Sequence, residues 1–268
     1  MGGLKSFMKK IISIFLTAIM CLSVFTGCGN GCSIGLRLYE NDIFIYTVGY
    51  DSGNVHILGL TEMGQQQNFL IIPNEIDGGK VIGLGADGYD KKKINEKYGK
   101  EIYASFNSEK LKKIFIEMKY LDYDTIDINF GSVPNLEGIY LVEKIEFNKK
   151  NGYAFLEEYS SRNIYTAEAI EFGRGKFTKK ANVLYVYNYV NTYSDEYYWI
   201  DNYKYGEKIE YIPEQPLRDG YTFEGWYKEE ECINRWNFAT DSLPSEQLDN
   251  DGNVVYQETK LYAKWIKN

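Results

Sequence analysis

Apolar and polar positions alternate in two short stretches near the start of the globular part. They are IFIYTV (43–48) and VHILGL (55–60), and YDSGN (50–54) joins them with three turn-forming residues. This pattern predicts a β-hairpin. The next segment, FLIIP (69–73), predicts a buried strand that Pro73 ends, and DGG (77–79) predicts a turn.

A repeat follows with a period of 25 residues. Its copies are LKKIFIE from 111, LEGIYLV from 136 and SRNIYTA from 161, which place Ile114, Ile139 and Ile164 in register. A period of about 20 to 29 residues with short L-x-x-I-x-I strands is typical of a leucine-rich solenoid. One unit cannot bury its apolar face alone, so neighbouring units stack and their strands form one sheet.

The segment FLIIPNEIDGGKVIGLGADGY supports the same fold. It resembles the bacterial surface leucine-rich repeats, and the matching positions are Ile72, Pro73, Ile76, Gly78, Val81, Leu84 and Gly85. The resemblance covers about residues 40 to 187. It departs from the family in two ways: the later units lack the usual Ala-Phe pair, and DKKKINEKYGKEIY (90–103) interrupts the spacing as a solvated loop or short helix.

The pattern changes after Tyr187, where polar and aromatic residues mix. The segment that follows resembles the internalin B-type repeat, also called the Listeria–Bacteroides repeat. The motif residues are Tyr205, Gly206, Pro213, Pro216, Gly220, Tyr221, Thr222, Phe223, Gly225, Trp226, Tyr227, Leu261, Tyr262 and Trp265. The resemblance covers about residues 195 to 266. It implies a small β-grasp-like (ubiquitin-like) module of the kind found in arrays on bacterial surface proteins.

The aromatic residues of GYTFEGWY raise the question of core or ligand platform. Strict alternation would place Phe223 and Trp226 on opposite faces of a strand, with a bend or close backbone approach at Gly225. We expect Trp226 and Trp265 to fill the core and to bury roughly 200 Å² each. An aromatic platform for sugars is the alternative. The glutamates 229–231 are interpreted as a solvated charge run.

The N-terminus predicts export and lipid anchoring. An apolar run (11–25) follows a basic segment and ends in FTGC, which resembles the lipobox of bacterial lipoproteins, although Phe25 stands where that family usually has Leu. The resemblance implies a signal peptide over 1–27 and a diacylglyceryl group on Cys28, whose two chains would hold the protein to a membrane. Ordinary cleaved secretion and an uncleaved anchor are alternatives. A myristoylation pattern at MGGLKS does not fit an adjacent apolar run.

Net charge limits the classes of binding partner, and the cysteine count limits the possible disulfides. Loss of the signal peptide removes three lysines and no acidic residue, so the net charge falls from −8 to −11. Such a surface repels nucleic acid and anionic lipid head groups. Cys32 and Cys232 remain as a candidate disulfide, and two unpaired thiols are the preferred interpretation.

Other chemical motifs are weak, and we predict neither cofactor nor metal. GLGADG (83–88) lacks the helix that a dinucleotide site needs. GRGKFT (173–178) lacks the first glycine of a phosphate loop. DNDGN (249–253) has its glycine misplaced for a calcium loop, which leaves a weak surface site between Asp249 and Asp251 as the alternative. His56 is the only histidine, and we interpret it as an ordinary strand residue.

Together these features predict a mainly β protein. Its parts are a signal peptide (1–27), a tether (28–35), a short leucine-rich-repeat-like β solenoid (36–190) and the repeat module (191–268). The predicted function is a non-enzymatic, lipid-anchored adhesion or binding module at the cell surface. Its partner would be a surface protein or glycan of a host or neighbouring cell, and a solenoid offers an extended sheet face for protein ligands. There are two alternatives. One is a cell-wall-processing or carbohydrate-active hydrolase with a carboxylate site, and the other is a structural spacer.

Overall fold

The structure is a computed structural model, and its described residues all belong to the compact unit Leu36–Asn268. It describes residues 37–49, 52–84, 92, 96, 107–118, 120–121, 133–142, 146–147, 163–172, 175–176, 178–189 and 196–268. The predicted signal peptide and tether, with Cys28 and Cys32, lie outside the described residues and stay predictions.

The described part of the chain is mainly β, as the sequence predicts. Besides its strands it contains one helix whose bounds are described, the short 3-10 helix η1 (Gly64–Gln66). Two residues of the lysine-rich insertion are also described, and Lys92 and Glu96 are both helical and exposed. In this part of the chain no helix is long and apolar enough to cross a membrane.

The first sheet has the order β1-β2-β3-β6-β5. Its strands are β1 (Leu38–Glu40), β2 (Phe44–Val48), β3 (Val55–Leu60), β5 (Glu75–Ile76) and β6 (Gly79–Leu84). The predicted hairpin is present, because β2 pairs antiparallel with β3. The predicted DGG turn joins β5 to β6, with positive φ at Asp77 (51°) and Gly78 (77°).

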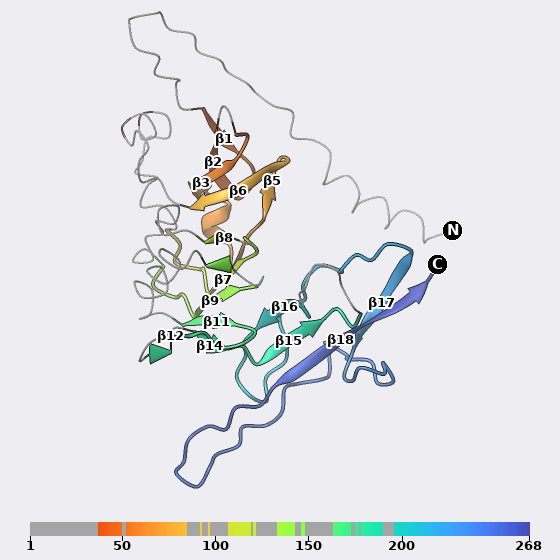
Figure 1. The fold of residues 1–268 in the computed structure, drawn as a ribbon. Coiled ribbons are helices and arrows are strands. Elements are labelled where there is room, and N and C mark those ends of the chain that lie inside the picture. The colour runs from red at the N-terminus through yellow and green to blue at the C-terminus, as the bar shows by residue number, and fades with distance from the viewer. Residues whose placement is uncertain are drawn as a thin grey trace, which may run out of the picture. The chain divides into compact units, whose positions relative to one another are not determined.

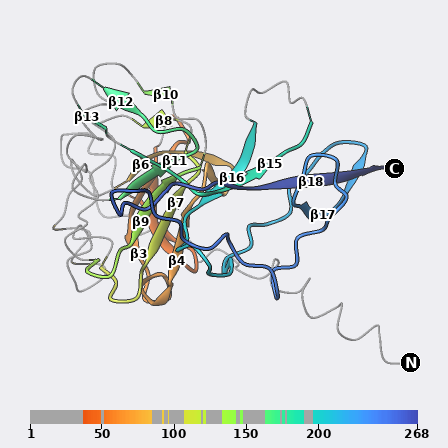
Figure 2. The ribbon, with the colours of Figure 1, turned by 90° about the horizontal axis from the view of Figure 1, so that it is seen from below.

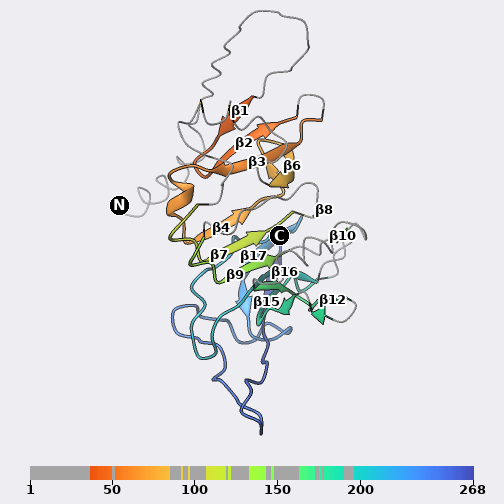
Figure 3. The same cartoon turned by 90° about the vertical axis from the view of Figure 1, so that its left-hand side faces the viewer.

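The second sheet is entirely parallel and has the order β14-β11-β9-β7-β4. Its strands are β4 (Phe69–Ile72), β7 (Lys113–Ile116), β9 (Gly138–Leu141), β11 (Ile164–Thr166) and β14 (Lys179–Lys180). Figure 3 shows β4, β7 and β9 side by side. Ile114 pairs with Ile139, and Ile139 pairs with Ile164, so the register follows the predicted period.

One face of the parallel sheet packs on a core that it shares with the first sheet. This core contains Val55, Ile57, Leu70, Ile72, Ile114, Ile116, Ile139, Leu141 and Ile164. Successive side chains of a strand point to opposite faces, so every second residue of β7 and β9 enters this core. Two small pairs accompany the repeats: β8 (Tyr120–Leu121) with β10 (Glu146–Phe147), and β12 (Glu171–Phe172) with β13 (Gly175–Lys176).

The third sheet contains the GYTFEGWY segment and has the order β16-β15-β18-β17. Its strands are β15 (Val183–Val186), β16 (Tyr197–Asp201), β17 (Tyr221–Tyr227) and β18 (Thr259–Lys267). The two central strands, β15 and β18, are parallel, and both outer pairs are antiparallel (Figures 1 and 2). The division at residue 190 stays a prediction, but β15, a central strand of this sheet, precedes it.

The prediction that successive side chains of β17 alternate strictly between the two faces of the sheet is wrong. The pairing of β17 with β18 shifts by one residue between Phe223 and Gly225, which is a β-bulge. The bulge brings the rings of Phe223 and Trp226 to 5.1 Å from each other. The bend expected at Gly225 is present: its φ is 154°, and a Cβ there would lie 2.9 Å from Arg235 Nε. Only glycine fits this position easily.

Candidate binding surfaces

The second face of the parallel sheet carries rings at the repeat positions. Phe115 pairs with Tyr140, and Tyr140 pairs with Tyr165, so the three residues form a row across β7, β9 and β11. Their neighbouring rings stack, with centroids 4.8 and 5.0 Å apart. We call Phe69, Ile71, Phe115, Tyr140 and Tyr165 the aromatic face.

The third sheet and the segment between β16 and β17 cover the centre of the aromatic face. The ring of Trp199, on β16, lies 4.8 Å from that of Phe115, and the ring of Tyr211 lies 5.5 Å from it. Phe115 is 0% exposed and Tyr140 is 2% exposed. The prediction that this sheet face serves an outside ligand is therefore wrong for its centre, because the chain itself fills that place.

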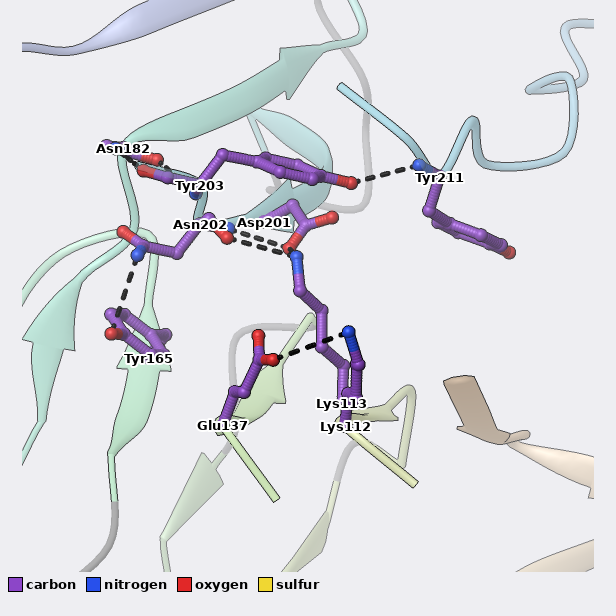
Figure 4. Close-up of polar contacts among 9 residues, drawn as sticks. All are labelled: Lys112, Lys113, Glu137, Tyr165, Asn182, Asp201, Asn202, Tyr203 and Tyr211. Carbon is purple, nitrogen blue, oxygen red and sulfur yellow. Dashed lines mark hydrogen bonds and ion pairs between the residues drawn. The ribbon is translucent and has the colours of Figure 1, made fainter. Parts of the chain in front are cut away.

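A buried ion pair lies at the edge of the same contact (Figure 4). Lys113 Nζ, from β7, lies 2.7 Å from Asp201 Oδ1, from the end of β16. The side chains are 6% and 0% exposed. Lys113 also donates to the carbonyl of Asn202 at 3.0 Å and lies 3.7 Å from the centroid of the Tyr203 ring. The carboxylate accepts a second hydrogen bond from the Asn202 amide at 2.7 Å.

Burial controls the titration of this group of residues. It raises the pKa of the Asp201 carboxyl, and the Lys113 ammonium acts in the opposite direction. Burial and the Asp201 charge also raise the pKa of Tyr140 and Tyr203 well above the ordinary value, so both hydroxyls stay neutral. Side chains buried this deeply cannot contact a substrate, so the Lys113–Asp201 pair has a structural role. Sequence reasoning missed both charged residues.

The motif residues of the repeat have two kinds of environment. Trp226 is 4% exposed, and its ring contacts those of Tyr185 (4.9 Å) and Tyr198 (5.9 Å) as well as Phe223. Tyr227 and Leu261 are also buried. Gly220 is an exposed turn residue with φ 75°, while Tyr221, Phe223, Tyr262 and Trp265 are half-buried.

Trp265 lies near the surface instead of in the middle of the module. Its indole N–H donates to the carbonyl of Tyr187 at 2.7 Å. Its ring meets the edge of Tyr189 at 5.5 Å and that of Phe223 at 5.7 Å. The two tryptophans therefore do not share one environment: Trp226 is buried inside, and Trp265 is half-buried at the margin of the same core cluster.

A cation is held among rings next to Trp265. The guanidinium carbon of Arg218 lies 3.7 Å from the ring centroid of Tyr221, 4.2 Å from that of Tyr189 and 5.8 Å from that of Trp265. Within the described residues Arg218 forms no ion pair. The adjacent Leu217 is 90% exposed. We call Tyr189, Leu217, Arg218, Tyr221 and Trp265 the Arg218 patch.

The glutamate run is solvated only in part. Glu229 Oε1 accepts hydrogen bonds from the Ile233 amide at 3.1 Å and from the amide and side chain of Asn234. Glu229 therefore closes the turn that follows β17, and only Glu230 and Glu231 are simple exposed charges.

The weak calcium candidate uses its carboxylate within its own loop. Asp249 Oδ1 accepts from the amides of Asp251 (2.9 Å) and Asn253 (2.8 Å). The Asn253 amide contributes most to lowering the pKa of Asp249. Among the described residues no three His, Cys, Asp or Glu side chains group as metal ligands.

The remaining candidates also have local explanations. Cys232 forms no disulfide with a described residue, and its thiol lies 3.3 Å from Asn188 Nδ2. His56 lies against Gly83, where a Cβ would collide with the imidazole, and burial lowers the pKa of His56. The first glycine of GLGADG is thus a strand glycine that makes room for a ring, while 85–88 lie outside the described residues.

Comparison with known proteins supports the repeat assignment. Residues 188–264 match the family model of the Listeria-Bacteroides repeat domain. The chain is also similar to Internalin H of Listeria monocytogenes serovar 1/2a. The two are 31% identical over 124 residues, which is 44% of this chain and 20% of that protein. This chain therefore spans about a fifth of the length of its relative.

Proposed function

We propose that this chain is an exported bacterial surface protein that is anchored through a lipid on Cys28 and acts as a non-enzymatic adhesion or binding module. The match to the Listeria-Bacteroides repeat domain carries the proposal, since resemblance to that repeat implies a bacterial surface protein. Similarity to Internalin H supports it. The basic N-terminus, the apolar run and the FTGC sequence support export and anchoring.

We also propose a finer fold assignment. One strand per 25-residue unit, paired in parallel register, supports a leucine-rich-repeat-like solenoid. The order β16-β15-β18-β17 with a parallel central pair supports a β-grasp-like C-terminal module. The connection between β16 and β17, residues 202–220, is fully described and contains no helix, although a β-grasp fold usually carries one there.

The Arg218 patch is the proposed ligand surface. It combines tyrosine, tryptophan and arginine, the residues that dominate binding energy at protein interfaces. The rings of Tyr189 and Tyr221 already hold the guanidinium, so Arg218 keeps a fixed position and its outer N–H groups can meet a carboxylate. Open ring faces, which a sugar platform needs, are partly occupied. A protein partner with an acidic group is therefore favoured over a neutral glycan.

The test uses residues 29–268 on arrays of glycans and of purified host and bacterial surface proteins. We expect a protein partner whose binding is lost in Arg218→Ala and kept in Ile233→Ala, a matched control because Ile233 is 74% exposed outside the patch. Binding that Arg218→Ala leaves unchanged would exclude the patch. Hydrolysis of an array glycan would contradict the non-enzymatic function.

A further inference from the structure

We propose that the Lys113 side chain and the Asp201 carboxyl condense to an intramolecular amide, a covalent cross-link between β7 and the end of β16. The cross-link is a modification of the chain that neither the ion pair nor the packing around it requires. It goes beyond the proposed function and does not depend on export, on lipid anchoring or on the identity of any ligand.

The first support is the position of the two reacting groups (Figure 4). Lys113 Nζ lies 2.7 Å from Asp201 Oδ1, and a hydrogen bond of 3.0 Å to the carbonyl of Asn202 holds the nitrogen there. Asp201 is held in turn, because it pairs with Val183 in the third sheet and its Oδ1 accepts from the Asn202 amide. Two well-oriented groups in contact can react as if each were present at roughly 10⁵ M or more. Such an advantage is what an unactivated carboxyl and an amine need to form an amide.

The second support is the exclusion of water. The two side chains are 6% and 0% exposed, and the ring centroids of Tyr140 and Tyr203 lie 5.5 and 3.7 Å from Lys113 Nζ. An amide forms from a neutral amine and a neutral carboxylic acid, and burial disfavours charged groups. Burial accordingly raises the pKa of the Asp201 carboxyl. The face of the Tyr203 ring acts in the other direction, because it stabilises the ammonium ion, and the ion pair is therefore the starting state of the reaction.

The third support is the uneven hydrogen bonding of the carboxylate. Oδ1 of Asp201 accepts from both Lys113 and the Asn202 amide, whereas Oδ2 is buried and accepts no hydrogen bond from the described residues. A buried polar oxygen without a partner is costly. Condensation removes this cost, because Oδ2 leaves as water and Oδ1 stays as an amide carbonyl that keeps the hydrogen bond from Asn202.

The step balances without a cofactor or co-reactant. One proton of the Lys113 ammonium passes to Oδ1, which leaves an amine beside a carboxylic acid, and a desolvated lysine amine is a competent nucleophile. Its lone pair adds to Cγ of Asp201, and a second nitrogen proton moves to Oδ2. The Cγ–Oδ2 bond then breaks, and water leaves with the proton from Oδ1. The product is an Nζ–Cγ amide with one N–H, and nothing is oxidised or reduced.

The cross-link would join the second sheet to the third across 88 positions of sequence. Like a disulfide, it would stabilise the chain mainly by constraining the unfolded state, and long loops gain most from such a constraint. The positions equivalent to Lys113 in the next two repeats are Gly138 and Asn163, and neither has an amine. Only the β7 unit of these three can therefore be linked to Asp201.

Peptide mass mapping of the full chain tests the proposal. The folded chain is incubated, denatured and digested with trypsin, which cuts after lysine and arginine but not after a lysine whose amine is in an amide. We expect a branched peptide in which residues 113–119 are joined to residues 181–204, lighter than the two separate peptides by one water. Its fragment ions should place the bond at Lys113 and Asp201. Recovery of residues 114–119 and 181–204 only as separate peptides would overturn the proposal.

Two controls separate the cross-link from the ion pair. Lys113→Arg keeps a cation at this position, but a guanidinium stays charged and is no nucleophile, so residues 181–204 should be recovered unlinked. The neighbouring pair of Lys112 and Glu137, 3.8 Å apart and 52% and 57% exposed, is an amine and a carboxylate in water, and trypsin should cut fully after Lys112 in the same digest. A branched peptide from Lys113→Arg, or a link at Lys112, would show that the bond does not depend on the buried geometry and would contradict the proposal.

Discussion

Replacing Trp226 with alanine distinguishes a core residue from a ligand platform. The indole is 4% exposed and lies within 6 Å of three other rings. Removing a large buried aromatic side chain costs roughly 3 to 5 kcal/mol. The collapse of neighbouring rings is limited here because Tyr185 is itself buried on β15 and cannot move far. The cost should therefore lie in the upper part of that range.

The assay is urea unfolding of the compact unit, residues 36–268, followed by tryptophan fluorescence and circular dichroism. A loss of roughly 3 to 5 kcal/mol moves the midpoint by at least about 1 M, since m is roughly 1 to 3 kcal/mol/M. Total domain stability is typically only about 5 to 15 kcal/mol, so the loss should be a large share of the total. Ile233→Ala is the matched control, because Ile233 is 74% exposed and should change stability by less than about 0.5 kcal/mol.

An unchanged urea midpoint would refute the core assignment of Trp226. If Trp226→Ala unfolds at the midpoint of the parent, the indole contributes no packing and the core assignment is wrong. Loss of glycan binding in the same folded variant would then establish the platform. Trp265→Ala provides an internal comparison, because Trp265 is half-buried at the end of the sheet. It should lower the midpoint by a clearly smaller amount than Trp226→Ala.

Three other predictions use different assays. Cys28→Ala should move the exported chain from the detergent phase to the aqueous phase on fractionation, and retention in the detergent phase would exclude lipidation there. A fragment of residues 191–268 lacks β15, a central strand of the third sheet, and should show no cooperative thermal transition. This expectation does not depend on whether the longer fragment, residues 178–268, folds. A cooperative transition of the 191–268 fragment would contradict the sheet order. Glu229→Ala should destabilise the chain by about 1 kcal/mol through loss of the turn hydrogen bonds, and Glu230→Ala by less than about 0.5 kcal/mol. Equal urea midpoints for the two variants would show that Glu229 has no structural role.

Local patterns predicted the local structure well. The 25-residue period placed Ile114, Ile139 and Ile164 in one row, and the strands pair in that register. The prediction succeeds because each repeat strand pairs with the equivalent residues of the neighbouring repeat, so the repeat period determines the pairing register. The β2–β3 hairpin was predictable for a similar reason, since its turn residues lie between two alternating stretches.

The bulge in β17 shows where alternation fails. Counting by two places Phe223 and Trp226 on opposite faces, but one extra residue at the bulge reverses every later side chain. Gly225 signalled a bend, although not its effect on Trp226. The neighbour that requires glycine there, Arg235, comes from the turn after the strand. A contact between segments of this kind has no period in the sequence.

The buried pair shows a different limit. Lys113 occupies a repeat position where the next copies have Gly138 and Asn163, so nothing in the pattern distinguishes it from a solvated lysine. Its partner lies 88 positions away in a sheet of another type. One usable signal was present, however. The alternate residues of the repeat strands, Phe115, Tyr140 and Tyr165, are aromatic where a solvated face would be polar. Large apolar side chains recur at the repeat period on both faces, isoleucines on one and rings on the other. This pattern indicates a sheet that is covered on both faces, and its centre is filled by the chain itself.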